Sequence, residues 1–203
     1  MKKLKLYHVL DDYINYLRKF DRKVFLNKEE ERRRDRKKDR KYLGTVLHIN
    51  NFKYFVPLSS PKESDYIMMG GKKEIRKSVI PIMRIVVKDK SGNDELKGTI
   101  KFSNMIPVPD RALIKYNVKN EVDEDYKILL LKEISFINSN SVSIIKNAQV
   151  IYTQKIKKYS INYLKDTVEF SLLEEKCQEY ENLKQNVEKA YQQIAAADDT
   201  PVS

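Results

Sequence analysis

The chain has 203 residues, 41% of them hydrophobic, and carries 40 Lys and Arg against 29 Asp and Glu, a formal net charge of +11. This size suits one domain with a single core, which we expect to span residues 1–197 before a disordered tail at residues 198–203. The excess of positive charge favours polyanionic partners. The lone cysteine, Cys177, excludes an internal disulfide and is typical of a reducing compartment, so we expect a cytoplasmic protein. Apolar runs are too short for a membrane span or a signal peptide, which argues against membrane insertion and secretion.

A short strand and a helix are the first predicted elements. Residues 4–9 (LKLYHV) indicate a strand, and the helix that follows is expected to continue to about residue 20. Asp11 or Asp12 is expected to cap this helix. Tyr13 lies on its apolar side.

Residues 28–41 are all charged, nine positive and five negative. We expect the run to stay outside the core. One interpretation is a solvated face. The other is a segment that binds phosphates, because neutralising a phosphate releases condensed counterions. The two interpretations are compatible. The basic side chains near the N-terminus and in this run that are expected to bind RNA are Lys2, Lys3, Arg32, Arg33, Arg34, Arg36, Lys37 and Lys38.

Two pairs of strands are predicted next. Residues 43–49 and 52–58 flank an Asn-Asn pair, which tolerates positive φ and predicts a β-hairpin. Residues 79–87 and 98–108 flank the turn-rich segment KDKSGND and form the second pair.

Helices are predicted for the rest of the chain. The first begins near Asp123, with Ile128, Leu131, Ile134 and Ile137 as its apolar face, and the second covers residues 141–158. A long amphipathic helix completes the chain, with an S-x-x-E capping box at its start. An antiparallel sheet followed by helices defines an α+β fold.

The sequence lacks the P-loop, dinucleotide-binding, zinc-protease and nucleophile-elbow motifs. His8 and His48 lie in predicted strands, where a structural role is more common than a catalytic one. A zinc site would need more ligands than any cluster in the chain provides, so no metal or cofactor is expected.

One short segment carries chemistry. In FVPLSSPKES (residues 55–64), a strand ends at two serines that stand between Pro57 and Pro61, and Lys62 follows directly. The plain interpretation is a turn. The functional interpretation is that a stiff bend presents Ser59, Ser60 and Lys62 together. RNA can be cut when its own 2′-hydroxyl attacks the adjacent phosphorus, and serine hydroxyls and an ammonium can stabilise the phosphorane while a tyrosine or lysine moves the protons.

Five segments carry a family resemblance: LYHVLDDYINYLRKFDRKV, YFVPLSSPK, IKFSNMIPV, DYKILLLKEISFINSN and FSLLEEK. In this order, from Tyr7 to about Tyr180, they resemble the endoribonuclease toxins of type III toxin–antitoxin systems, the ToxN/AbiQ family. The resemblance implies a compact β-barrel-like core, as in the MazF and Kid toxins, elaborated with helices. It also implies a metal-independent ribonuclease that leaves a 2′,3′-cyclic phosphate.

The partner implied by the resemblance is RNA. A repeated antitoxin transcript, cut into pseudoknotted units, would hold the toxin inactive in a closed assembly, and no protein antitoxin is expected. Cellular and phage RNA would be the substrates, with growth arrest and abortive infection against phage as the outcome.

Site residues follow from the same resemblance. Tyr13 matches an active-site tyrosine, Ser60 and Lys62 match the catalytic serine and lysine, and Ser59 stands where a threonine is common. Phe170 matches a phenylalanine near the site and is expected to contact RNA. We therefore expect Lys62 and Ser60 to hold the scissile phosphate, Ser59 to bond a neighbouring oxygen, and Tyr13 to orient the reacting groups or shuttle a proton.

Three other classes of protein remain open. A non-catalytic RNA-binding regulator explains the charge and the aromatic content equally well. A DNA-binding protein is less favoured, since there is no helix-turn-helix or zinc-finger signature. A structural protein could use the C-terminal helix as a dimer seam, although that helix more often packs on its own domain.

Overall fold

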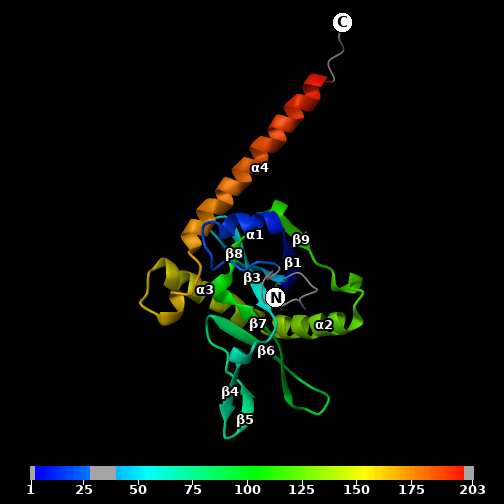
Figure 1. Cartoon of the computed structure of the whole chain (residues 1–203), viewed down its shortest axis with the longest axis vertical. Helices are drawn as coiled ribbons and strands as arrows, with labels where there is room; N and C mark the ends of the chain where they lie inside the picture. Colours follow the sequence, from blue (N-terminus) through cyan, green and yellow to red (C-terminus); the bar gives the residue numbers. More distant parts are fainter. Residues whose placement is uncertain (1–2, 28–39, 199–203) are drawn as a thin grey trace.

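The computed structural model describes residues 3–27 and 40–198, and its centre is an antiparallel sheet (Figure 1). The strand order is β6-β7-β3-β2-β1-β9, with β8 also paired to β3. The strands of this sheet are β1 (Lys5–Val9), β2 (Tyr42–Ile49), β3 (Phe52–Ser59), β6 (Ile82–Lys88), β7 (Asp94–Lys101), β8 (Ile106–Pro107) and β9 (Leu113–Lys115). Strand β3 is central because it pairs with β2, β7 and β8.

Four α-helices are described around the sheet: α1 (Asp11–Arg18), α2 (Glu124–Ser139), α3 (Ser141–Ile156) and α4 (Phe170–Asp198). Helix α2 packs on β6 and β7, α3 on β2, and the first part of α4 on β8 and α1. The rest of α4 projects far from the body, and a separate hairpin, β4 (Tyr66–Met69) with β5 (Lys72–Ile75), projects on the opposite side (Figure 1). The α+β architecture with a long C-terminal helix is therefore as predicted.

The barrel-like core implied by the resemblance is not confirmed. Closing a sheet into a barrel requires its two end strands to pair, and within the described residues β6 and β9 form the ends of an open order. Strand β9 is only three residues long. The sheet therefore stays open.

The β2–β3 hairpin confirms the turn prediction, since Asn50 and Asn51 have φ of 49° and 67°. The second pair of strands differs in extent. Strand β7 begins at Asp94, and the chain turns away after Lys101, so β8 pairs with β3 instead of continuing β7. The β4–β5 hairpin was not predicted, although its Gly70-Gly71 turn, with φ of 55° and 77°, is the local signal that marks it.

Helix faces and caps also differ from the prediction in places. Ile128 and Leu131 are about half exposed, whereas Leu130, Glu133 and Ile137 are the buried residues of α2. The inward face of α2 that was predicted from the three-residue spacing of its apolar residues is therefore partly wrong.

Asp123 caps α2 through its side chain, which accepts a hydrogen bond from the Tyr126 N–H, whereas α1 has no side-chain cap. The predicted capping box of the last helix is wrong, because α4 already begins at Phe170 and the Glu174 carboxylate accepts hydrogen bonds from Tyr54 and Tyr152 instead.

The end of the charged run enters the core, contrary to expectation. Arg40 and Lys41 are 3% and 5% exposed. The guanidinium of Arg40 donates to the carbonyl oxygens of Leu26 and Leu58, and the ammonium of Lys41 lies 4.4 Å from the centre of the Tyr116 ring. Buried cations are tolerated when such partners replace water.

No described helix taken singly has both the length and the apolar content of a membrane span; α2 and α3 pass that test only jointly, across a 76° bend.

Candidate functional site

The segment after β3 is held by backbone contacts around Lys62. The Lys62 N–H donates to the Asp65 carboxylate at 3.0 Å, and the Asp65 N–H donates back to the Lys62 carbonyl at 2.9 Å. The Lys62 side chain is exposed. The backbone of Lys62 is therefore fixed while its ammonium stays accessible.

A buried ion pair anchors this loop to the sheet. Asp65 and Arg84 are 2% and 6% exposed and approach to 3.0 Å, and Arg84 also donates to the carbonyl of Lys77. Breaking a buried pair leaves an uncompensated charge, so its geometry resists distortion. The turn that follows the serines is consequently a fixed feature of the fold.

The two serines have different surroundings. Ser59 is 7% exposed, and its hydroxyl oxygen accepts a hydrogen bond from the Arg40 guanidinium at 2.8 Å. Ser60 is exposed one residue further on. The structure thus gives Ser59 a contact that holds the strand end, and leaves the Ser60 hydroxyl facing solvent.

A cationic cavity of about 610 Å³ opens beside this turn. Its lining combines Lys62 and Ser64 of the turn with the end of β7 and the segment after α1. Five cations (Arg18, Arg22, Lys23, Lys62, Lys101) and one carboxylate (Asp166) line it, together with the rings of Phe25 and Tyr163. Positive side chains in a concave surface concentrate polyanions, so this cavity, which we call the cationic cavity, is suited to a phosphodiester.

Lys101 was not predicted as a site residue from the sequence, although it is the second residue of the segment IKFSNMIPV. Its pKa lies below the ordinary value, first because of burial and then because of Lys62, Arg84 and Arg40, with Asp65 acting in the opposite direction. A lysine of lowered pKa gives up its proton more readily. Lys62 and Lys101 therefore place two amino groups in one cavity, and the pKa of Lys101 is lowered there.

Tyr13 lies in the core and is not among the residues that line the cationic cavity. It is fully buried, its hydroxyl donates to the Pro107 carbonyl at 2.8 Å, and its ring meets Tyr180 edge-on at 4.8 Å. Burial, followed by the nearby Cys177, raises its pKa well above the ordinary value. The predicted role of Tyr13 in the reaction stays a prediction, and its observed contacts stabilise the packing of α1 on β8.

Phe170 is 1% exposed and stacks on Tyr152 at 5.3 Å, with Tyr54 edge-on at 5.7 Å. It borders a second hollow of about 740 Å³ and does not line the cationic cavity. Lys62 lines the cationic cavity and not this larger hollow, so the structure does not bring Phe170 and Lys62 into one cavity.

Most of the predicted RNA-binding cations, Lys2 and the six residues between Arg32 and Lys38, lie outside the described residues. Lys3 is described and exposed. Within the described ranges, no group of three or more His, Cys, Asp or Glu side chains is arranged to hold a metal ion.

Comparison with known proteins defines the class to which this chain belongs. The sequence model of the family "Toxin ToxN, type III toxin-antitoxin system" matches residues 5–178. The chain therefore belongs to the ToxN family of type III toxin–antitoxin toxins, which confirms the resemblance seen in the sequence.

Two characterised relatives are named endoribonucleases. Endoribonuclease AbiQ of Lactococcus lactis subsp. lactis is 33% identical over 179 residues, covering 87% of this chain and 89% of the relative. Endoribonuclease ToxN of Bacillus thuringiensis subsp. kurstaki is 29% identical over 192 residues, covering 91% and 88%.

Solved structures agree in fold. That of AbiQ, described as a lactococcal anti-phage endoribonuclease, has a TM-score of 0.70 at 28% identity and covers 89% of this chain and 99% of its own. A second, from a type III system described as showing selective toxin inhibition by a non-coding RNA pseudoknot, has a TM-score of 0.69 at 27% identity with the same coverage.

Proposed function

We propose that this chain is an endoribonuclease toxin that cuts RNA in the cationic cavity and leaves a 2′,3′-cyclic phosphate. The observation that carries the proposal is that Lys62, on a turn fixed by the Asp65–Arg84 pair, lines the same cavity as the partly buried Lys101. Two ammonium groups in one hollow stabilise the charge that builds up on a phosphorane. The named activity of the relatives supports the same conclusion.

In the proposed reaction, the substrate supplies the nucleophile. The 2′-hydroxyl oxygen bonds to the adjacent phosphorus and loses its proton, while the bond from phosphorus to the 5′ oxygen breaks and that oxygen gains a proton. Lys62 binds the non-bridging oxygens, with the exposed Ser60 as a further donor at the mouth of the turn. Lys101 donates the proton to the leaving oxygen, because its lowered pKa makes the ammonium a stronger acid than an ordinary lysine.

The proposed partner is a structured antitoxin RNA. The chain's net charge of +11 favours RNA, and a structural neighbour is described as inhibited by an RNA pseudoknot. We propose that repeat units of such an RNA cover the cationic cavity in a closed assembly, in a cytoplasmic protein that acts on cellular and phage RNA.

The decisive test is Lys62→Ala, with Lys72→Ala on the exposed β4–β5 hairpin as the matched control. Loss of a charge-stabilising donor is expected to slow cleavage by roughly 10²- to 10³-fold, whereas the control cuts normally. Cleavage of a long transcript in EDTA would be followed on denaturing gels, and the new 3′ ends analysed by mass spectrometry.

Unchanged cutting by folded Lys62→Ala would remove the central residue from the proposal. Tight RNA binding by the unmodified chain with no cyclic phosphate at any end would favour the non-catalytic RNA-binding regulator instead.

A further inference from the structure

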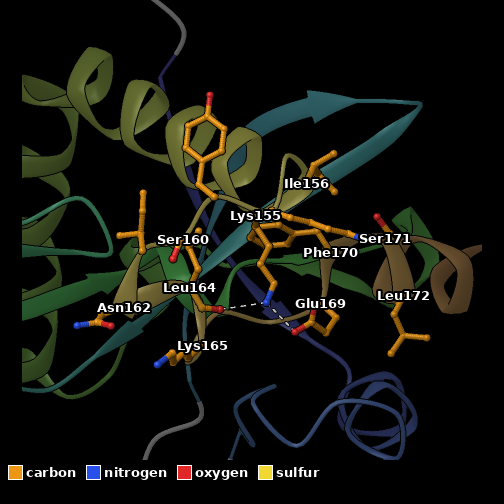
Figure 2. Close-up of a pocket in the computed structure, with 13 residues that line it drawn as sticks. Lys155, Ile156, Ser160, Asn162, Leu164, Lys165, Glu169, Phe170, Ser171 and Leu172 are labelled. Atoms are coloured by element: carbon orange, nitrogen blue, oxygen red, sulfur yellow. Dashed lines mark hydrogen bonds and ion pairs between the residues drawn. The ribbon is translucent and has the colours of Figure 1, made fainter.

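A second hollow lies between the end of α3 and the start of α4, outside the cationic cavity. It measures about 740 Å³, within the size range of pockets that hold small ligands. Figure 2 shows Ser160, Asn162 and Lys165 on one side and Ser171 and Leu172 on the other, with Lys155 and Phe170 between them. We call it the α3–α4 pocket.

The cations of this pocket divide into two kinds. The Lys155 ammonium is already engaged, because it donates to the Leu164 carbonyl at 3.0 Å and to the Glu169 carboxylate at 2.6 Å (Figure 2). Lys158 and Lys165 also line the pocket, and both are exposed. Lys158 and Lys165 are thus accessible cations of the pocket, whereas the charge of Lys155 is neutralised by Glu169.

The remaining lining suits a nucleobase. Tyr159 is 50% exposed, and the apolar floor includes Phe170 and Leu172. Ser160 and Asn162 add an exposed hydroxyl and an amide at the rim. An aromatic face, hydrogen-bonding groups and nearby cations are the combination that binds unpaired nucleotides, whose bases stack while their phosphates meet lysines.

The α3–α4 pocket and the cationic cavity share one wall. In the loop between α3 and α4, Tyr163 and Asp166 line the cationic cavity, whereas Asn162 and Lys165 line the pocket. Glu169 joins the two hollows, because it pairs with Lys155 of the pocket and also with Lys23 of the cavity at 3.1 Å. The two hollows therefore lie on either side of this loop.

We propose that the α3–α4 pocket binds an unpaired nucleotide of the RNA strand whose scissile phosphate lies in the cationic cavity. Tyr159 stacks on the base, Lys158 and Lys165 contact the flanking phosphates, and the Lys155–Glu169–Lys23 bridge holds the wall between the two hollows. The inference rests on the proposed function for the location of the cut, but the binding of the nucleotide can be measured without cleavage.

The binding test uses the full chain carrying Lys62→Ala and a fluorescent, degenerate single-stranded RNA of about twenty nucleotides, longer than the span of one binding module. Tyr159→Ala and Lys158→Gln are each expected to raise the dissociation constant roughly tenfold. The matched control is Lys157→Gln, since Lys157 is an exposed neighbour that does not line the pocket. With an RNA duplex of the same length, Tyr159→Ala is expected to change nothing, because paired bases are unavailable for stacking.

The cleavage test uses the chain with Lys62 intact. Tyr159→Ala is expected to raise KM roughly tenfold for the long strand, with kcat unchanged, and to leave cleavage of a strand of about four nucleotides unaffected, since so short a strand fills only the cationic cavity. Losses of equal size on both strands would overturn the assignment, as would binding by Tyr159→Ala and Lys158→Gln that equals that of Lys157→Gln.

Failure of the two proposals can be told apart. If no variant yields a cyclic phosphate but Tyr159→Ala still weakens binding of the single strand, the proposed function fails and the nucleotide pocket stands. If the chain cleaves RNA and Tyr159→Ala alters neither binding nor KM, the pocket fails and the proposed function stands.

Discussion

The pKa of Lys101 is shifted in opposite directions by two sets of neighbours. Burial and the charges of Lys62, Arg84 and Arg40 lower its pKa, and Asp65 raises it. The net effect is a lowered pKa, so the Lys101 ammonium gives up its proton more readily than an ordinary lysine does. Such a group can bind an anion before the reaction and donate a proton during it.

Replacing Lys62 by Met is expected to raise the pKa of Lys101, because one of the cations that lower it is removed. The pKa should stay below its ordinary value, since burial, the largest cause, remains. NMR titration of isotope-labelled lysine would follow Lys101 directly, with Lys90→Met in the exposed β6–β7 turn as control. An unaltered Lys101 titration in Lys62→Met would show that the two ammonium groups do not interact.

The serines show how far residue chemistry can be predicted from the sequence. Two hydroxyls beside a lysine, between prolines, suffice to predict a stiff turn, and the structure has one. The buried contact of Ser59 could not be predicted, because its partner Arg40 lies 19 positions away in a run of charged residues that was expected to be solvated. Lys101 was missed for the same reason: only the pairing of β7 with β3 brings it beside Lys62.

Among the elements, α2 makes an unusual contact with the sheet. Glu133 is 7% exposed on its inward face, and a Cβ placed on Gly98 of β7 would lie 2.5 Å from its Oε1. The same position on Gly98 is 3.3 Å from the Ser59 carbonyl oxygen, so Gly98 lies between the carboxyl of α2 and the end of β3. Burial raises the pKa of Glu133 to about 7.

Glu133 is therefore expected to make stability depend on pH. In the unfolded chain it ionises around its ordinary pKa of 4.5, whereas the folded chain keeps the proton until about pH 7. Between these values the folded state holds the extra proton, so rising pH favours unfolding, by up to about 3 kcal/mol in total.

Glu133→Gln should abolish this loss, and its advantage over the unmodified chain should grow from pH 4 to pH 8 in urea denaturation. Asp125→Asn, at an exposed position of the same helix, is the control. Parallel stability curves for Glu133→Gln and the unmodified chain would show that the carboxyl is solvated in the folded protein.

Elements whose signal is local were predicted best. The Asn-Asn turn alone determines the β2–β3 hairpin, and the Asp123 cap marks the start of α2. The inward face of α2 could not be predicted from its spacing, because both faces of the helix carry aliphatic residues and a glutamate takes one of the buried positions. The pairing of β8 with β3 after Lys101 depends on contacts between residues far apart in sequence. No local sequence pattern predicts such contacts.

At the scale of the whole molecule, the body and the projecting part of α4 are distinct. The family match ends at residue 178, whereas the helix continues to Asp198. Leu183, Val187, Tyr191 and Ile194 are at least half exposed along the extension. The sequence correctly predicted a long amphipathic helix and favoured its packing on its own domain, but periodicity alone does not show where the body ends.

The extension is tied to the body mainly near its base. Tyr180 is 5% exposed and donates to Asp12 at 2.7 Å, and Lys184 pairs with Asp12 at 3.0 Å. Further out, Glu188 pairs with Arg111 at 2.9 Å, with 63% of the glutamate side chain exposed. An exposed pair of this kind contributes little to stability.

A chain ending at Gln185 is therefore expected to keep its free energy of unfolding within about 1 kcal/mol and its RNA cleavage within about twofold. A chain ending at Gln178 also loses the buried Tyr180 ring against Tyr13, and should lose about 3 kcal/mol or more. Urea denaturation and the cleavage assay on both chains would separate the two effects. If the chain ending at Gln185 lost cleavage while remaining folded, the extension itself would have to contact RNA. The catalytic unit would then have to include the part of α4 that lies beyond the family match.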